Sequence, residues 1–456
     1  MLYRTTPTQT TVLALALFAL FFTGCMSKYA IKQDDAREAV IRGDFSSAAK
    51  FYLEDKKPTD YVDVLLNRGL ARFETGDFLN AENDLRRSYE KIDELFTKSI
   101  SKGALSLVTN DRALAYSGTN LERGMLHYYR ALGYLNRGDR DGFSIETRSL
   151  TKYLDQLPGL SKRSYTDDGF LRYFGGIGFD MASQPNDAWI AYEHARTAYP
   201  KSYGSVPTFV FPASLSAAKR TGIVSADSVT RSGVELPKSG EGRLVLIVET
   251  GVICGLENNE ITIPLFEKDF SCDFDNNFDY DAYGNELWYR RDNYSSGGYK
   301  IVDWIRIAIP SVTKSGESQI SQVRVGIDGN EILAVPAADL SHVFQSEFKD
   351  RFPGILARTF ARAILKRGAA NLAKKEGGDV GFWLTKIAGD LTEVADTRSW
   401  ALLPDRIHVL DRTLPAGSHT INVLGTGTNI ESKSGGPETI QIEPGKITVK
   451  RIRLIG

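Results

Sequence analysis

The sequence predicts an α+β fold, in which an all-helical first half is followed by a half that mixes β-strands with helices. The first observation is a helical pattern between about residues 30 and 200, where apolar side chains recur every three or four positions. The second is the alternation of apolar and polar residues farther on, at 301–309 (IVDWIRIAI) and 319–327 (QISQVRVGI), which is typical of strands. We therefore expect a helical domain over 35–204 and a β-rich domain over 205–456.

A short motif repeats through the helical half. Gly-Asp-Phe begins at Gly43 and again at Gly76, 33 residues later, and Gly-Asp returns at Gly138 after a further 62 residues. A fourth copy is expected at Asn186. Glycine permits the tight turn that joins two antiparallel helices, and a period of about 34 residues resembles the tetratricopeptide repeat. The alternative is an irregular helical bundle in which the spacing has no structural meaning.

The second half is predicted to hold its helices in the middle. Apolar residues at three- and four-residue steps predict helices over about 337–394, with arginines and lysines on their polar side. That side either faces solvent or contacts an anionic lipid or glycan surface. A β-rich end is expected over about 400–456. Further strand candidates lie at 243–249, 260–264 and 331–335.

The N-terminus carries a secretion signal. The apolar run at 12–22 is too short to span a bilayer as a helix, and two small residues follow it. An ordinary cleaved signal peptide or a short buried helix is the alternative. The next residue, Cys25, resembles the acylated cysteine of bacterial lipoproteins, although Phe22 stands where an aliphatic residue is usual. We expect removal of 1–24, acyl chains such as palmitate on Cys25, and a tether over 25–34.

The residues after Cys25 and the overall charge bear on location and partners. Met26 and Ser27 stand in place of an aspartate, which by resemblance to Gram-negative sorting implies the periplasmic face of the outer membrane. The net charge of −1 gives no reason to expect a nucleic-acid partner, which needs a clustered basic face. The expected partners are an envelope protein or peptide, and the membrane through the lipid anchor.

Two cysteines remain once Cys25 is acylated. Cys254 and Cys272 form an even pair, and the periplasm is oxidising, so the pair is interpreted as a disulfide. The alternative is two buried free thiols.

Polar and aromatic residues in two segments are candidate binding or structural positions. Glu122 and Arg123 are adjacent, so on a helix they point about 100° apart. They either form a polar groove that holds a partner or tie a tyrosine or a loop carbonyl inside the helical array. Asp396 and Arg398 are expected to form an ion pair, with Trp400 packed against the helices. Alternatively, this second segment lines a binding cleft.

These segments also carry a resemblance. The chain contains, in order, Cys25, the Gly-Asp-Phe repeats, the segment 118–123 and the segment 395–404 (ADTRSWALLP). Together they resemble a poorly characterised family of Gram-negative envelope lipoproteins, which joins a tetratricopeptide-like half to a mixed α/β C-terminal half. The resemblance implies an envelope location and supplies no catalytic residues to carry over. Its signature positions correspond to Glu122, Arg123, Asp396, Arg398 and Trp400.

An acidic and aromatic stretch follows Cys272. Its oxygen-bearing residues fall at positions 1, 3, 5 and 12 of a calcium loop, but Tyr280 stands where such a loop needs glycine. Because of this spacing, calcium is the one cofactor that the sequence suggests. The alternative is an acidic surface loop without a metal, whose aromatic residues pack it against the protein. The candidate ligands are Asp275, Asn277, Asp279 and Glu286.

The sequence favours a binding protein over an enzyme. It contains no zinc-ligand spacing, no nucleophile elbow and no phosphate loop. The preferred hypothesis is a protein-interaction scaffold in envelope assembly or regulation, which holds a protein or peptide on its repeat surface. The alternative is a glycan-binding or glycan-acting envelope enzyme. It would use the loop 273–291, with the aspartates at 273–281 and Glu286 as acids and with Trp288 and Tyr289 as sugar platforms.

Overall fold

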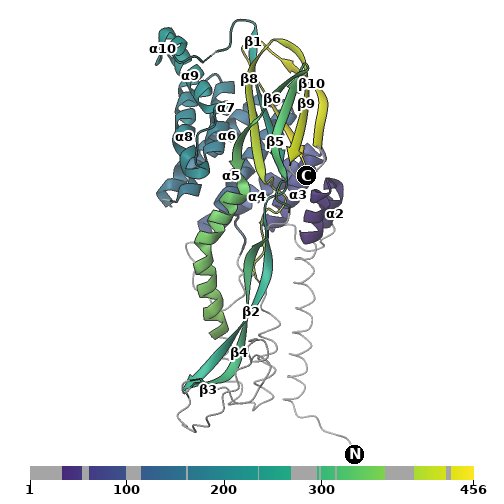
Figure 1. Ribbon diagram of the computed structural model, residues 1–456, viewed down its shortest axis with the longest axis vertical. Coiled ribbons are helices and arrows are strands. Elements are labelled where there is room, and N and C mark those ends of the chain that lie inside the picture. The colour runs from purple at the N-terminus through teal and green to yellow at the C-terminus, as the bar shows by residue number, and fades with distance from the viewer. Residues whose placement is uncertain are drawn as a thin grey trace, which may run out of the picture.

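The computed structural model shows a body of helices and sheets with a long hairpin projecting from it (Figure 1). Cys25, Cys272 and the candidate calcium ligands Asp275, Asn277, Asp279 and Glu286 lie outside the described residues. The structure describes residues 33–53, 61–98, 115–160, 163–234, 236–268, 295–296, 299–313, 316–364, 395–427 and 433–455.

The helical half is built from helical hairpins. Successive helices pack against each other along the chain, from α2 to α9. A helix over 33–41 comes first, so the predicted tether over 25–34 ends inside it. The rest are α2 (Phe45–Leu53), α3 (Val62–Glu74), α4 (Phe78–Lys98), α5 (Asn120–Asn136), α6 (Arg140–Leu160), the 3₁₀ turn η4 (Ser164–Thr166), α7 (Gly169–Met181), α8 (Pro185–Tyr203), α9 (Val210–Thr221) and α10 (Ala226–Arg231).

Four of the hairpin turns share one geometry. Gly43, Gly76, Gly138 and Ser183 have φ of 79°, 80°, 77° and 57°. In each turn the N–H of this residue donates to the carbonyl three residues earlier, and the next N–H donates to the carbonyl five residues earlier. This pairing satisfies the last carbonyls of the first helix. The fourth turn therefore lies at Ser183, three residues before the predicted Asn186.

The aspartate of the Gly-Asp motif begins the second helix of the hairpin. Asp44 Oδ1 accepts the backbone N–H of Ser47 at 2.9 Å, and Asp139 Oδ1 accepts that of Gly142 at 2.7 Å. A side-chain acceptor at this position satisfies a backbone donor that the helix itself leaves open. The motif repeats because glycine ends one helix and aspartate starts the next.

The strands form three sheets. The first has the order β11 (Ile447–Leu454), β1 (Glu241–Thr250), β8 (Arg406–Pro415) and β7 (Val335–Asp339), with β1 and β11 parallel. The second is antiparallel and has the order β10 (Lys433–Ile442), β9 (Gly417–Gly427), β5 (Ile320–Ile327) and β6 (Asn330–Leu333). The third contains β2 (Gly255–Lys268), β4 (Tyr299–Thr313) and β3 (Ser295–Ser296).

The first sheet lies between the helices and the second sheet. On β1, Leu244 and Leu246 pack with residues of β5 and β9, whereas Val245 and Ile247 pack with the helices. Successive side chains of a strand point to opposite faces, so β1 is buried on both sides and reads as a continuous apolar run. The α+β class is confirmed. The helices run on through α9 and α10, past the predicted boundary at residue 204.

The long hairpin of β2 and β4 projects from the body, with a helix over 340–364 beside it (Figure 1). Ile307 and Ile309 of β4 pack against Ala363, near the end of the described part of this helix. Within the described residues, no helix is both long enough and apolar enough to cross a membrane.

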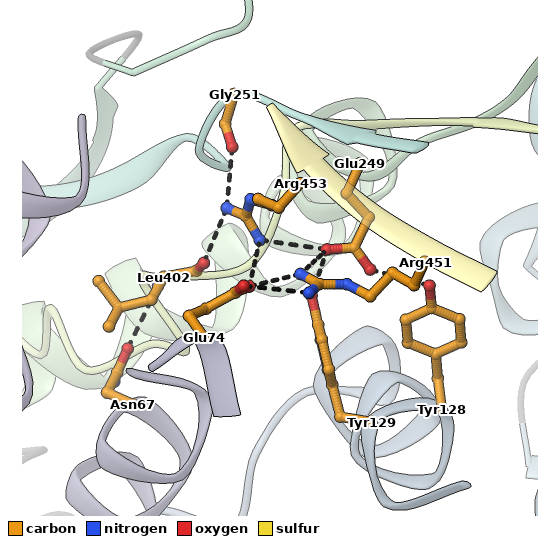
Figure 2. A network of polar contacts seen from close by, with 9 residues as sticks. All are labelled: Asn67, Glu74, Tyr128, Tyr129, Glu249, Gly251, Leu402, Arg451 and Arg453. Atoms are coloured by element: carbon orange, nitrogen blue, oxygen red, sulfur yellow. Dashed lines mark hydrogen bonds and ion pairs between the residues drawn. The ribbon is translucent and has the colours of Figure 1, made fainter. Parts of the chain in front are cut away.

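Buried charges join the two halves (Figure 2). Glu249 on β1 is 0 % exposed and accepts hydrogen bonds from the hydroxyls of Tyr128 and Tyr129, each at 2.8 Å. Arg451 on β11 pairs with Glu249 at 2.5 Å and with Glu74 at the end of α3. Burial alone raises the pKa of Glu249, but the charges and hydrogen bonds of the arginines outweigh it and hold the pKa below its ordinary value.

A second buried cluster lies at the other end of β1. Arg243 donates to Asp411 at 2.9 Å and to Asp180 of α7 at 2.9 Å. The hydroxyl of Tyr173 donates to Asp411 at 2.6 Å. Ion clusters therefore lie at both ends of β1. They bind the β-rich half to the helices through charge, in addition to the apolar contacts.

Candidate functional site

The segment 395–404 lies against the helices at the start of the chain, namely the helix over 33–41 and α3. The Asn67 side chain on α3 makes two hydrogen bonds to the backbone of this segment. Its Nδ2 donates to the carbonyl of Ser399 at 2.9 Å, and its Oδ1 accepts the N–H of Leu402 at 3.2 Å. The guanidinium of Arg37, in the helix over 33–41, donates to the carbonyl of Ala401 at 3.1 Å. The chain thus covers part of the surface of its own first helices.

Trp400 is the apolar anchor of this segment. Its side chain is 1 % exposed, and its ring lies 5.7 Å from that of Tyr129 on α5, centroid to centroid. The predicted packing of this tryptophan against the helices is confirmed.

Glu122 links this segment to the start of α5. Its carboxylate accepts the backbone N–H of Trp400 at 2.6 Å, the N–H of Thr119 at 2.8 Å and the hydroxyl of Tyr116 at 2.5 Å. Thr119 in turn accepts the N–H of Glu122 at 3.2 Å, which completes a capping box. Burial raises the pKa of Glu122, and the pKa of Tyr116 is raised by burial and by the adjacent carboxylate.

The other signature positions form the expected internal ties. Arg123 Nε donates to the carbonyl of Ser117 at 2.9 Å, which is the loop-carbonyl interpretation of this residue. Arg398 and Asp396 form the predicted ion pair through two parallel hydrogen bonds of 2.8 Å. The guanidinium carbon of Arg398 lies 5.4 Å from the ring centre of Tyr116. Glu122, Arg123 and Arg398 are therefore tied directly to the segment 115–119.

A pocket opens beside this junction. Its volume is about 300 Å³, and its walls come from the segment before α5, the β2–β4 hairpin, the helix over 340–364 and the segment 395–404. It therefore brings together parts of the chain that are far apart in sequence. The lining residues are Ala115, Tyr116, Ser117, Gly118, Leu256, Pro310, Phe348, Arg351, Ile355, Arg358, Asp396 and Arg398.

One helix face supplies a large part of the wall. Phe348, Arg351, Ile355 and Arg358 recur at steps of three and four residues, so they form a single stripe along the helix over 340–364. Two guanidinium groups and two apolar side chains alternate along it. We expected the arginines of this helix on a solvent-facing or lipid-facing side, and Arg351 is indeed exposed. The sequence offered no sign that Arg351 and Arg358 line a pocket together with Asp396.

Glu347 on the same helix fixes its position against α5. Its carboxylate accepts the backbone N–H groups of Asn120 at 2.8 Å and Leu121 at 3.3 Å. A carboxylate at a helix N-terminus pairs with open donors and with the positive end of the helix dipole. Sequence reasoning missed this residue because its partner lies 227 positions away.

Cys254 is a buried free thiol in the structure. Its Sγ donates to the carbonyl of Ser341 at 3.7 Å, and burial raises the pKa of the thiol. The structure gives no support to the disulfide with Cys272, which lies outside the described residues. Among the described residues, no three histidine, cysteine, aspartate or glutamate side chains gather as metal ligands.

No protein-family model matches this chain, and no curated protein matches it significantly. The chain's own geometry defines an α+β protein with a mixed polar and apolar pocket where the helical and β-rich halves meet.

Proposed function

We propose that this chain is a lipid-anchored scaffold on the periplasmic face of the outer membrane, and that it binds another envelope protein or peptide without chemical catalysis. The observation that carries the proposal is the pocket at the junction of the two halves. The Arg398–Asp396 ion pair belongs to its wall, and the sequence before the helical half contains a lipoprotein-type cysteine, Cys25.

We also propose that the helical hairpins are tetratricopeptide-like repeats. Their common turn geometry and the 33-residue spacing of Gly43 and Gly76 support this. Such arrays commonly offer an extended surface to a ligand. Here α3 and α5 already hold the segment 395–404 of their own chain, through Asn67 and Glu122. A partner is therefore expected at the pocket, in place of the repeat surface that the sequence suggested.

Anchoring is tested by replacing the acylated cysteine. In fractionated cells, Cys25→Ser should move the protein from the outer membrane to the soluble periplasmic fraction, because a protein that lacks acyl chains loses its membrane affinity. Cys254→Ser is the matched control and should leave the protein in the membrane. A Cys25→Ser protein that stays in the outer membrane would contradict the anchor.

Partner binding is tested by crosslinking in intact envelopes, followed by purification of the protein and its adducts. Wild type should give discrete adducts, and Phe348→Ala together with Ile355→Ala in the pocket should reduce them. Exposed Leu333→Ala on β6 is the control. Adducts that are unchanged in the pocket variant would place the partner elsewhere.

A further inference from the structure

We propose that the helix over 340–364 touches the lipid surface to which the chain is anchored, through an apolar stripe on its outer part. The stripe consists of Pro353, Ala357, Phe360 and Ile364, none of which lines the pocket. This inference rests on the proposed lipid anchor and adds a second contact between the protein and the membrane.

The residues of the stripe share one side of the helix. They follow one another at steps of four, three and four positions, which is the spacing of a single helix face. All four are exposed, and the exposed fractions of the two large side chains are 40 % for Phe360 and 64 % for Ile364. Phe348 and Ile355, which line the pocket, fall on the opposite side. Moving apolar side chains out of water is favourable, so this side favours a partner with an apolar phase.

The exposed side of the helix changes from polar to apolar along its length. Between Pro353 and Ile364 no exposed residue carries a charge. The helix runs outward from the body beside the β2–β4 hairpin, so this uncharged stretch is its outer part (Figure 1). A bilayer that meets the helix at its outer end would cover the apolar residues and leave the polar ones in water. The exposed residues of the inner part are His342, Lys349, Asp350 and Arg351.

The helix and the anchored end of the chain start from the same place. Ser341, near the start of the helix, accepts the backbone N–H of Cys254 at 3.0 Å. A Cβ on the next residue, Gly255, would lie 3.4 Å from the guanidinium of Arg37. Arg37 belongs to the helix over 33–41, which follows the predicted tether. The base of the projecting hairpin and helix therefore lies beside the first described helix.

The reach of the anchor matches the reach of the helix. Cys25 precedes Gln33 by eight residues, a stretch that spans at most about 29 Å. Phe360 follows Ser341 by 19 residues, or about 29 Å along an α-helix. The headgroups beside an acylated Cys25 are therefore about as far from the base as Phe360, or closer. An interfacial helix buries its apolar face about 5–10 Å into the boundary between headgroups and acyl chains.

Photocrosslinking of the full-length, acylated protein in phosphatidylcholine nanodiscs tests this inference. With benzoylphenylalanine in place of Phe360, irradiation should give adducts with phosphatidylcholine, which mass spectrometry detects. The matched control has benzoylphenylalanine in place of His342, which is exposed on the same face but 18 residues closer to the base, about 27 Å along the helix. It should give at least about tenfold fewer lipid adducts, because its position lies beyond the depth that an interfacial helix reaches.

The contribution of the stripe is tested in the same crosslinking protein. Ile364→Ser should reduce the lipid adducts at position 360 at least about threefold, because it removes apolar surface that the lipid would cover. Leu333→Ser changes an exposed leucine on β6 and should leave the adducts unchanged. Raising the salt from about 0.1 to about 0.5 M should also leave them unchanged, because the stripe is uncharged.

Four results would each overturn the inference: equal lipid adducts at positions 342 and 360, adducts with a second copy of the chain in place of lipid, an equal loss in Leu333→Ser, or loss of the adducts at high salt. Adducts are measured in protein that is bound to the nanodiscs, so their absence counts against the stripe and not against the anchor. Release of Cys25→Ser tests the anchor separately. The stripe is smaller than one acyl chain, which itself holds a protein only marginally, so it should not retain this variant on the membrane.

Discussion

The carboxylate of Glu122 accepts the backbone N–H of Trp400 at 2.6 Å, although 278 residues separate them. Glu122 begins a helix of the first half, and Trp400 belongs to the segment that leads into the last strands. Because Tyr116 binds the same carboxylate and lines the pocket, this one side chain connects the helical half, the β-rich half and the candidate site.

Glu122→Gln tests that connection. The amide keeps one acceptor oxygen and places an NH₂ group against donors of the junction, so a buried donor loses its partner. We expect a loss of about 2–3 kcal/mol in the free energy of unfolding, measured by urea denaturation. Glu331→Gln on β6 is exposed and should change this free energy by less than about 0.5 kcal/mol. Equal effects of the two variants would contradict the role of Glu122.

Local chemistry explains what the sequence predicted correctly. The turns at Gly43 and Gly76 depend on a positive φ and on an aspartate one residue later, and both features are visible in a short stretch of sequence. The Asp396–Arg398 ion pair is also local. Glu347 and Arg351 act on elements more than 200 positions away in the chain, so only the folded arrangement reveals them.

The surface of the helical half is occupied differently from what the sequence predicted. The surface of the helical half was expected to hold a foreign protein or peptide, and the helical pattern alone gives no reason to expect otherwise. Asn67 instead binds both an N–H and a carbonyl of the same chain. A period in the sequence therefore predicts a helical surface but not what occupies it.

The ion cluster at Glu249 should be a major determinant of stability. Glu249→Gln removes one of the two carboxylates that compensate Arg451 and Arg453 and leaves only Glu74 beside them, so buried positive charge is left in excess. We expect a loss of about 3–5 kcal/mol in the free energy of unfolding. Glu438→Gln breaks a partly exposed pair with Lys450 and should cost about 0–1 kcal/mol. Urea denaturation of both variants provides the comparison, and a loss at Glu249 no larger than at Glu438 would show that the cluster does not join the halves.

Two glycines in helices should respond in opposite ways to alanine. A Cβ at Gly176 on α7 would meet the ring of Tyr192 at 2.5 Å, and this tyrosine is fully buried. Gly176→Ala should therefore cost about 1–3 kcal/mol through overpacking. At Gly354 the nearest atom to a new Cβ is the end of the Arg358 side chain at 3.6 Å. Gly354→Ala should stabilise the protein by about 0.5–1 kcal/mol, because glycine weakens a helix relative to alanine. Thermal melting of both variants measures the two signs.

His408 should make the protein less stable in mild acid. It is buried on β8, and burial together with the charge of Arg406 lowers its pKa to about 4 from an ordinary value of 6.5. The unfolded chain takes up a proton below pH 6.5, whereas the folded chain resists until about pH 4. The stabilisation from neutral His408 is thus complete above pH 6.5 and is lost as the pH falls towards 4, by up to about 3 kcal/mol.

Urea denaturation of wild type and His408→Gln at several pH values across this range checks the prediction. Buried Glu122 and Asp405 have raised pKa values and act in the opposite direction, so the quantity to compare is the difference between the two proteins. The difference in the free energy of unfolding between wild type and His408→Gln should shrink steadily from about pH 6.5 to pH 4. His419 provides the contrast. Hydrogen bonds to the carbonyl of Pro415 and to Asp328 raise its pKa, so His419→Gln should remove stability that is greatest in acid. A parallel pH dependence in the two histidine variants would contradict the buried, neutral state of His408.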